Sequence, residues 1–203
     1  MKPNPPKAVV FDLGKVLLDF DYGLLARRVA PRCRLTAEEF RREVDQSPLL
    51  HRYETGLIDD QGFLDAVIGR SGFDGSREEL GRLFGDIFTP IPEMVALHGR
   101  LVALGIPTYV FSNTNAFAIR HIRESYPFYA GFTGEILSFE VRSMKPDAGI
   151  YAALENLSGL RGADLLYLDD RPENVEAGSA RRWRAWMHSD PSVTVPRVLD
   201  LFR

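Results

Sequence analysis

The stretch Val9-Val10-Phe11-Asp12-Leu13-Gly14 decides the fold of this chain. Its apolar residues extend back to Ala8 and end in a carboxylate, and the glycine beyond lets the backbone turn sharply. A short run that is apolar on both faces is typical of a strand in a parallel sheet covered by helices. We therefore predict Asp12 at the carboxyl edge of a buried parallel strand, where open α/β sheets build their binding sites.

Further apolar runs predict four more strands, at 106–111, 136–139, 165–168 and 185–187. Helical patterns lie between and after them, at 93–104, 115–126, 147–157, 172–180 and 197–202. This alternation implies right-handed crossovers and an α/β fold with a doubly wound sheet. Three polar clusters stand at or just beyond the ends of these runs: Ser112-Asn113, Lys145-Pro146 and Asp169-Asp170.

The interval from Asp21 to about Pro90 interrupts the alternation. It has helix starts, with Thr36–Glu39 and Ser76–Glu79 spaced as capping boxes, and no convincing strand. We predict a helical cap at 21–90, inserted after the first strand of a core that comprises 1–20 and 91–203.

The composition is that of an ordinary globular chain of 203 residues, with 45% hydrophobic and 26% charged residues. A net charge of −3 gives no electrostatic reason to expect nucleic acid or an anionic membrane as a partner. The single cysteine, Cys33, excludes an internal disulfide and indicates a reducing compartment. The first seven residues do not resemble a signal peptide, and no stretch is long enough to cross a bilayer. We expect a cytoplasmic protein, either a monomer or a homodimer.

The strand-end clusters together predict a metal-assisted phosphoryl site. If the strand ends converge, carboxylates repel one another: two of them about 4 Å apart cost roughly 4 kcal/mol at an effective dielectric of 20. Hard oxygen ligands without sulfur or histidine favour Mg²⁺ as the neutralising ion. A carboxylate beside Mg²⁺ and a lysine can attack phosphorus. The predicted groups are three carboxylates, an ammonium, a hydroxyl and an amide, from Asp12, Asp169, Asp170, Lys145, Ser112 and Asn113.

The order of these motifs resembles that of the haloacid dehalogenase superfamily. The motifs are Asp12-Leu13-Gly14, Phe111-Ser112-Asn113, Lys145-Pro146 and Leu168-Asp169-Asp170, and the resemblance spans residues 9 to about 180. Finer detail is similar to small helical-capped phosphatases, including those that act on α-D-glucose 1-phosphate. That detail lies in Phe11-Asp12-Leu13-Gly14-Lys15-Val16, Ser112-Asn113-Thr114-Asn115 and Tyr53-Glu54-Thr55-Gly56.

The resemblance implies a Rossmann-like three-layer core with strand order 5-4-1-2-3, counted along the chain, under a helical cap. It implies a phosphatase for a small phosphorylated metabolite, with Asp12 as nucleophile. Ser112, Asn113 and Lys145 would hold the phosphate, with Ser112 and Lys145 also catalytic. Mg²⁺ would bind Asp12, the Gly14 carbonyl and the acidic pair. Within that pair, Asp170 would bind the ion directly and Asp169 would bind it either directly or through a water. Asn174 would support the metal ligands from behind.

Gly14 departs from the superfamily pattern, which usually has an aspartate at this position as general acid and base. Such help is worth roughly 10²–10⁴-fold in rate. Either another group substitutes, or the substrate has a good leaving group, as an anomeric sugar phosphate does. The candidate substitutes are Lys15, Asp19, Asp21 and His51.

Two other interpretations remain open at this point. The first is another chemistry of the superfamily, such as 2-haloacid dehalogenation or a phosphomutase reaction. The second is a phosphate-binding pseudo-enzyme, in which Gly14 marks the loss of hydrolysis.

Overall fold

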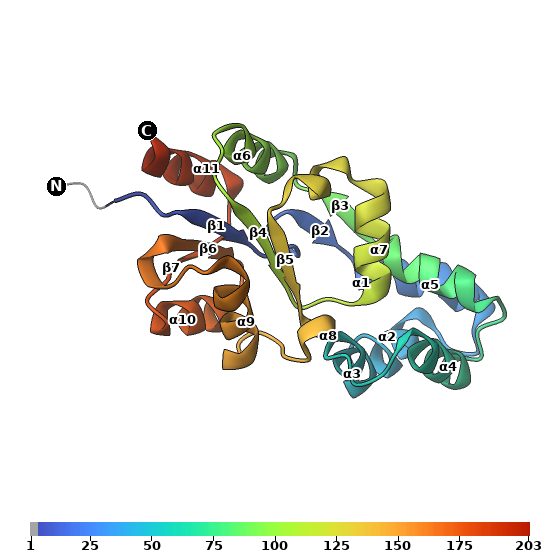
Figure 1. Cartoon of the computed structure of the whole chain (residues 1–203). Coiled ribbons are helices and arrows are strands. Elements are labelled where there is room, and N and C mark those ends of the chain that lie inside the picture. The colour runs from blue at the N-terminus through green and yellow to red at the C-terminus, as the bar shows by residue number, and fades with distance from the viewer. Residues whose placement is uncertain (1–3) are drawn as a thin grey trace.

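A five-stranded parallel sheet forms the centre of the protein in a computed structural model that describes residues 4–203 (Figure 1). Only the first three residues of the N-terminal stretch considered for a signal peptide lie outside this range. The strand order is β5-β4-β1-β6-β7. The labels β2 and β3 belong to a second sheet, so the five strands of the central sheet are numbered 1 to 5 along the chain for comparison with the prediction. The observed order is then 3-2-1-4-5, which is the predicted order 5-4-1-2-3 read from the opposite edge. The strands are β1 (Ala8–Phe11), β4 (Thr108–Ser112), β5 (Gly134–Leu137), β6 (Leu165–Asp169) and β7 (Arg184–Met187).

The central strand β1 is fully buried, as its continuous apolar sequence predicts. Phe11 lies opposite Val110 on one neighbour and Leu168 on the other. Val9 and Phe11 face an apolar cluster with α6 (Pro92–Ala103), α7 (Ala116–Ser125) and α11 (Pro191–Leu199). Val10 faces a second cluster with α9 (Ala148–Ser158) and α10 (Pro172–Ala180). The helices therefore form a layer on each side of the sheet, and the three-layer prediction is confirmed.

Two predicted elements are displaced along the chain. The strand expected at 136–139 is β5 at Gly134–Leu137, because the short helix α8 (Ser138–Val141) begins directly after it. The helix expected around 197–202 is α11, which begins at Pro191 after its N-cap Asp190. Single-turn 3₁₀ segments complete the core, at Pro127–Gly131, Gly162–Asp164 and Asp200–Phe202. Within residues 4–203, each helix is too short or too polar to traverse a bilayer.

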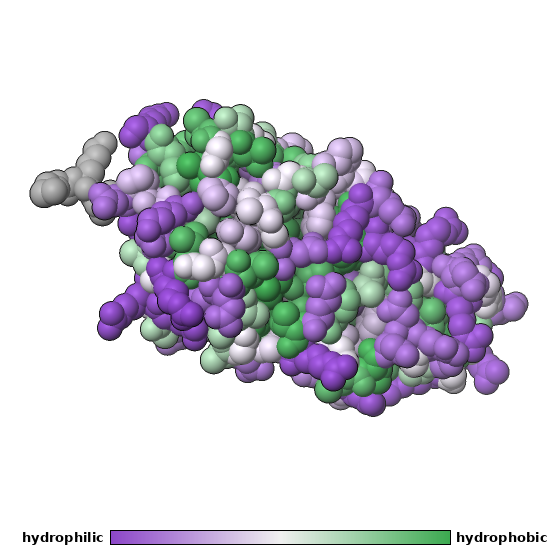
Figure 2. Space-filling view, viewed as in Figure 1, coloured by the Kyte–Doolittle hydropathy of each residue, from purple (hydrophilic) through white to green (hydrophobic). Residues whose placement is uncertain are grey.

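The remaining helices gather at one end of the molecule (Figure 1). They enclose an apolar cluster of their own, which includes Phe40, Phe63 and Leu80. Hydrophilic residues predominate over the α4 and α5 end of this region on the face shown in Figure 2. A cap bounded at residues 21 and 90 stays a prediction. The helices are α1 (Tyr22–Val29), a 3₁₀ turn (Ala30–Arg32), α2 (Ala37–Glu43), α3 (Pro48–Glu54), α4 (Asp60–Ser71) and α5 (Arg77–Gly85).

One of the two predicted capping boxes is complete. Thr36 accepts a hydrogen bond from the Glu39 backbone, and the Glu39 carboxylate accepts one from the Thr36 backbone. Ser76 also accepts from the Glu79 backbone, but the Glu79 carboxylate pairs with Arg32 instead. The second helix start is therefore correct, although its reciprocal bond is replaced by an ion pair.

The expectation of no strand between residues 21 and 90 is wrong at its end. β3 (Phe88–Pro90) pairs antiparallel with β2 (Leu18–Phe20), and the Phe20 and Phe88 ring centroids lie 6.0 Å apart. Three-residue strands are too short to produce a periodic pattern. This small sheet pairs the segment that follows β1 with the segment that precedes α6.

Candidate active site

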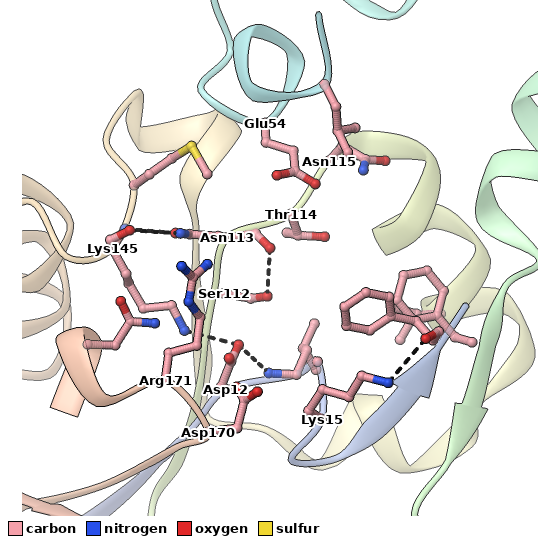
Figure 3. A pocket seen from close by; sticks show the side chains of 18 of the residues that line it. Asp12, Lys15, Glu54, Ser112, Asn113, Thr114, Asn115, Lys145, Asp170 and Arg171 are labelled. Carbon is pink, nitrogen blue, oxygen red and sulfur yellow. Dashed lines mark hydrogen bonds and ion pairs between the residues drawn. The ribbon is translucent and has the colours of Figure 1, made fainter. Parts of the chain in front are cut away.

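The carboxyl ends of β1, β4 and β6 form the floor of a pocket of about 210 Å³ (Figure 3). These ends carry Asp12, Ser112 and Asp170 respectively. Helices α1 and α3 contribute Tyr22 and Glu54 to the same pocket. All eight residues that the sequence predicts for the site are together here: Asp12, Gly14, Ser112, Asn113, Lys145, Asp170 and Asn174 line the pocket, and Asp169 lies buried behind Lys145.

Asp12 is held in place by backbone and side-chain contacts. Its backbone N–H donates to the Leu168 carbonyl at 3.0 Å, which continues the β1–β6 ladder. Its Oδ1 accepts from the Leu13 backbone at 2.7 Å and lies 3.0 Å from Lys145 Nζ. Among residues 4–203, no hydrogen bond reaches Asp12 Oδ2. The carboxylate is thus fixed through one oxygen, and the other is available for chemistry.

Lys145 bridges two carboxylates from a fully enclosed position. Its Nζ lies 3.0 Å from Asp12 Oδ1 and 2.7 Å from Asp169 Oδ2, and it donates to the Phe111 carbonyl at 2.9 Å. Burial opposes its charge, but the two carboxylates raise the pKa of Lys145 above its ordinary value. The ammonium therefore remains charged between Asp12 and Asp169.

The two residues of the acidic pair have different surroundings. Asp169 Oδ1 accepts from the Arg171 backbone at 2.9 Å and from Asn174 Nδ2 at 3.0 Å, and its Oδ2 accepts from Lys145 and Tyr167. Burial disfavours the charge of Asp169, but Lys145 holds its pKa below the ordinary value. Asp170 is only half-buried, and burial together with the Asp169 charge raises its pKa. Asp169 therefore anchors Lys145, whereas Asp170 faces the pocket.

The donor set fits a hard divalent cation. Asp12, Asp169 and Asp170 each present an oxygen within 4.8 Å of the others. Burial raises the pKa of Asp12 to about 7 and outweighs the opposing effect of Lys145, so a further cation beside Asp12 would favour its charged form. Asn174 Oδ1 is buried and has no hydrogen-bond partner among residues 4–203. An ordered water or a bound ion can satisfy such an oxygen.

Ser112 and Asn113 occupy the end of β4 but present different groups. The Asn113 side chain donates to the Lys145 carbonyl at 2.9 Å and accepts from the Lys145 backbone at 2.7 Å. Its amide group is therefore used to hold the Lys145 loop. Ser112 is buried, and among residues 4–203 its Oγ makes only a long contact of 3.4 Å with the Asn113 carbonyl. The Ser112 hydroxyl is the freer of the two for a ligand.

A family model described as haloacid dehalogenase-like hydrolase matches residues 6–180. The chain belongs to that family. The match includes every predicted site residue, and it agrees with the resemblance of the four motifs.

Solved structures of haloacid dehalogenase-like proteins share the fold at low sequence identity. A family enzyme of Bacteroides thetaiotaomicron, in complex with magnesium and inorganic phosphate, is 18% identical over 91% of this chain and 94% of its own, with a TM-score of 0.77. A predicted family hydrolase of Porphyromonas gingivalis is 18% identical over 98% of both chains, with a TM-score of 0.81. The L-2-haloacid dehalogenase of Xanthobacter autotrophicus, with chloropropionic acid covalently bound, is 18% identical over 88% of this chain and 75% of its own, with a TM-score of 0.64.

In this haloacid dehalogenase-like hydrolase, the space beside Gly14 is filled. A Cβ atom at Gly14 would lie 2.8 Å from a ring carbon of Phe20 on β2. A carboxylate at this position would have to displace that ring. An acid and base at this position would therefore require the Phe20 ring to move.

The four candidate substitutes lie mostly outside the pocket. Asp19 is exposed and pairs with Lys15, which does line the pocket. Asp21 caps α1 by accepting from the Gly23 backbone at 2.7 Å, and it also pairs with Arg27. His51 is exposed on α3. Of the four, Lys15 alone reaches the lining, and its ammonium is already paired.

Glu54 is a site residue that sequence reasoning missed. It lies at the end of α3, lines the pocket, and has Oε1 3.4 Å from the Tyr22 hydroxyl (Figure 3). Burial raises the pKa of Glu54 to about 7, although hydrogen bonds from Asn115 and Tyr22 favour its charged form. The Tyr53-Glu54-Thr55-Gly56 stretch drew attention to this segment. The sequence predicts a cap over the site, but it does not indicate which side chain at the end of α3 enters the pocket.

Proposed function

We propose that this hydrolase is a Mg²⁺-dependent phosphatase that acts on a small phosphorylated metabolite through an aspartyl-phosphate on Asp12. The observation that carries the proposal is Asp12 itself, which is held through Oδ1 beside Lys145 while Oδ2 is unengaged in residues 4–203. The related Bacteroides enzyme, which was solved with magnesium and phosphate, supports the same reaction class.

Asp12, Asp170 and the Gly14 carbonyl would hold the ion. Asp169 and Asn174 would support it from behind, because Asp169 is already occupied by Lys145 and Asn174 donates to Asp169. A bound Mg²⁺ would neutralise the carboxylates and polarise a phosphoryl oxygen.

The chemical step requires an in-line attack by Asp12. Its Oδ2 would form a bond to phosphorus as the bond from phosphorus to the leaving oxygen breaks, and the electron pair would depart with that oxygen. Ser112 would hold an equatorial oxygen, and the charge of Lys145 beside Asp12 would offset the negative charge that concentrates there during transfer. Water would then hydrolyse the aspartyl-phosphate.

The pocket fits a compact substrate such as a sugar phosphate, for example glucose 1-phosphate. Its volume of about 210 Å³ is small for a ligand site. Aromatic and polar groups stand together in its walls, an arrangement that suits the apolar faces and hydroxyls of a sugar. We propose that helices in the interval 21–90 act as the cap that closes over it. The walls include Phe20, Tyr22, Leu50, Phe88, Thr114 and Asn115.

Hydrolysis assays test the proposal directly. Purified protein is incubated with p-nitrophenyl phosphate and a panel of sugar phosphates, with Mg²⁺ or with EDTA. We expect turnover that needs Mg²⁺ and is abolished by Asp12→Asn, because an amide oxygen is a poor nucleophile. Glu38→Gln, an exposed carboxylate on α2, is the matched control and should keep full activity.

Three outcomes would contradict the proposal. Full turnover by Asp12→Asn would exclude this nucleophile. Release of chloride from 2-chloropropionate without Mg²⁺ would favour dehalogenation instead. Binding of phosphate without turnover of any substrate in the panel would favour the pseudo-enzyme.

A further inference from the structure

Three carboxylates line the pocket in the described part of the chain: Asp12, Asp170 and Glu54. The first two lie in the carboxylate cluster on the pocket floor. Glu54 approaches from the opposite wall, above Thr114 in Figure 3. Since Asp12 would attack phosphorus from the floor, an in-line leaving group departs away from the floor, toward the wall that carries Glu54.

The main chain fixes Glu54 relative to the phosphate end of the site. Its carbonyl accepts a hydrogen bond from Ser138 Oγ at 2.6 Å, and the same Oγ accepts from the Thr114 backbone at 3.0 Å. Ser138 is completely buried and follows β5, so one core side chain connects the end of α3 to the loop after Ser112. Gly56 passes so close that a Cβ there would lie 2.2 Å from the Phe139 carbonyl. The glutamate is therefore set by a core contact rather than by α3 alone.

The surroundings of Glu54 suit a group that exchanges a proton. Tyr22 from α1 and Asn115 from the start of α7 hydrogen bond to it, while Lys15 and Arg171 are the other cations of the lining besides Lys145. Burial raises the pKa of Glu54 to about 7. A general acid and base works best when its pKa is near the operating pH. Tyr22 cannot serve instead, because burial raises its pKa well above the ordinary value.

We infer that Glu54 supplies the acid and base function for which Gly14 has no side chain. This inference rests on the proposed phosphatase activity and names a residue of the same site. In the first step the leaving oxygen takes the proton of Glu54 as its bond to phosphorus breaks. In the second step water attacks phosphorus and gives a proton to the Glu54 carboxylate. The bond from phosphorus to Asp12 breaks, its electron pair returns to Asp12, and Glu54 is protonated again.

A binding role for Glu54 predicts different kinetics. If Glu54 only accepted a hydrogen bond from a substrate hydroxyl, Glu54→Gln would raise KM by a similar factor at every pH. It would also leave p-nitrophenyl phosphate, which carries no such hydroxyl, unaffected. An acid and base instead affects rate, pH profile and leaving-group dependence together.

The test compares Glu54→Gln, Glu54→Asp and the control Glu38→Gln in the Mg²⁺-loaded enzyme. With an alkyl phosphate that the wild type hydrolyses, we expect Glu54→Gln to lose about 10²–10⁴-fold in kcat/KM. With p-nitrophenyl phosphate the loss in kcat/KM should be far smaller, because nitrophenolate leaves without a proton. The slow second step should then appear as a burst of nitrophenolate before steady turnover.

The pH profile provides the second readout. The wild-type kcat/KM for the alkyl phosphate should fall as pH rises through about 7, because the acid must be protonated. Glu54→Gln should lack this limb, and Glu54→Asp should keep it at a lower rate, which separates loss of the proton from misfolding.

Two results would overturn the assignment of Glu54 and leave the proposed phosphatase intact. One is an equal loss of kcat/KM by Glu54→Gln on the alkyl phosphate and on p-nitrophenyl phosphate. The other is a fall of kcat/KM at high pH that is the same in Glu54→Gln as in the wild type. Absence of any Mg²⁺-dependent turnover by the wild type would refute the phosphatase, and with it the role of Glu54. Glu38→Gln should match the wild type in every measurement.

Discussion

Adjacent acidic residues have separate tasks at the end of β6. Asp169 is fully buried, and its two oxygens accept four hydrogen bonds, including one from Lys145. Asp170 is half-buried beside the same cluster. Removal of one partner of a buried ion pair leaves the other charge uncompensated, at a cost of about 3–5 kcal/mol. Removal of a carboxylate from an acidic cluster instead relieves repulsion.

The variants Asp169→Asn and Asp170→Asn should therefore differ in stability although both lose activity. In EDTA at pH 7, urea unfolding should show a loss of about 3 kcal/mol or more for Asp169→Asn. Asp170→Asn should retain wild-type stability or gain slightly. The pKa of Asp169 is held low, so its stabilisation is present above its unfolded pKa and disappears as pH falls through the folded value. The deficit of Asp169→Asn should thus shrink in acid, and equal deficits for the two variants would contradict this division of tasks.

Sequence reasoning found the residues on the floor of the site but not the one on its wall. Ser112 and Asp169 end apolar strands, Asp12 directly follows one, and parallel strands bring their carboxyl ends to one edge. A local pattern is enough for that inference. Glu54 reaches the site because its carbonyl bonds Ser138, a residue far away in the sequence. No local pattern contains such a contact, so the structure was needed to find it.

Among the elements, those with a strong local signal were predicted well and those defined by pairing were not. β1 and α10 have the predicted bounds, since a buried run before a glycine and a proline at the first helical position are both clear signals. β2 precedes the inserted helices in the sequence and β3 follows them, and the two strands pair with each other. Neither strand has a recognisable strand pattern in its own sequence.

The contact between α3 and α8 makes the loop after α3 sensitive to a single methyl group. Gly56 has a φ of +66° and almost touches the Phe139 carbonyl, so Gly56→Ala is strained both by its own backbone and by the neighbour. We expect a loss of about 1–3 kcal/mol in urea unfolding, and a lower kcat/KM for an alkyl phosphate because Glu54 moves with this loop.

Gly69→Ala is the matched control for that substitution. Gly69 lies inside α4, and an added Cβ would meet nothing within 4 Å in the described residues beyond its chain neighbours and its own helix backbone. Alanine favours a helix over glycine by about 1 kcal/mol. Gly69→Ala should therefore stabilise the protein and leave kcat/KM for the alkyl phosphate unchanged. Comparable losses from both glycines would mean that the approach to Phe139 is not what makes Gly56 necessary.

At the scale of the whole molecule, the sheet and the inserted helices meet at a pocket that gathers several carboxylates. The α/β layers are predicted by composition and alternation, because each strand buries its own apolar face. How the helical segment sits on the core depends instead on contacts such as Ser138 with Glu54, which join distant parts of the chain. The pocket between them contains carboxylates from both parts, including Asp12 on the floor and Glu54 on the wall.

A divalent cation should therefore stabilise the entire fold, and more strongly at higher pH. Ligand binding to the folded state alone adds about 2.7 kcal/mol at a concentration one hundred times Kd. The pKa of Asp12 is raised to about 7 by burial, so at pH 5.5 a proton competes with the ion for this carboxylate, and at pH 8 it does not.

Thermal unfolding with and without MgCl₂ should show a larger rise in Tm at pH 8, and Asp170→Asn should lose most of that rise at both pH values. NaCl at matched ionic strength controls for screening, since a general salt effect would raise the wild type and Asp170→Asn alike. An equal response to NaCl and MgCl₂ would mean that the acidic cluster binds no ion, and the charge argument for a metal-dependent enzyme would fail with it.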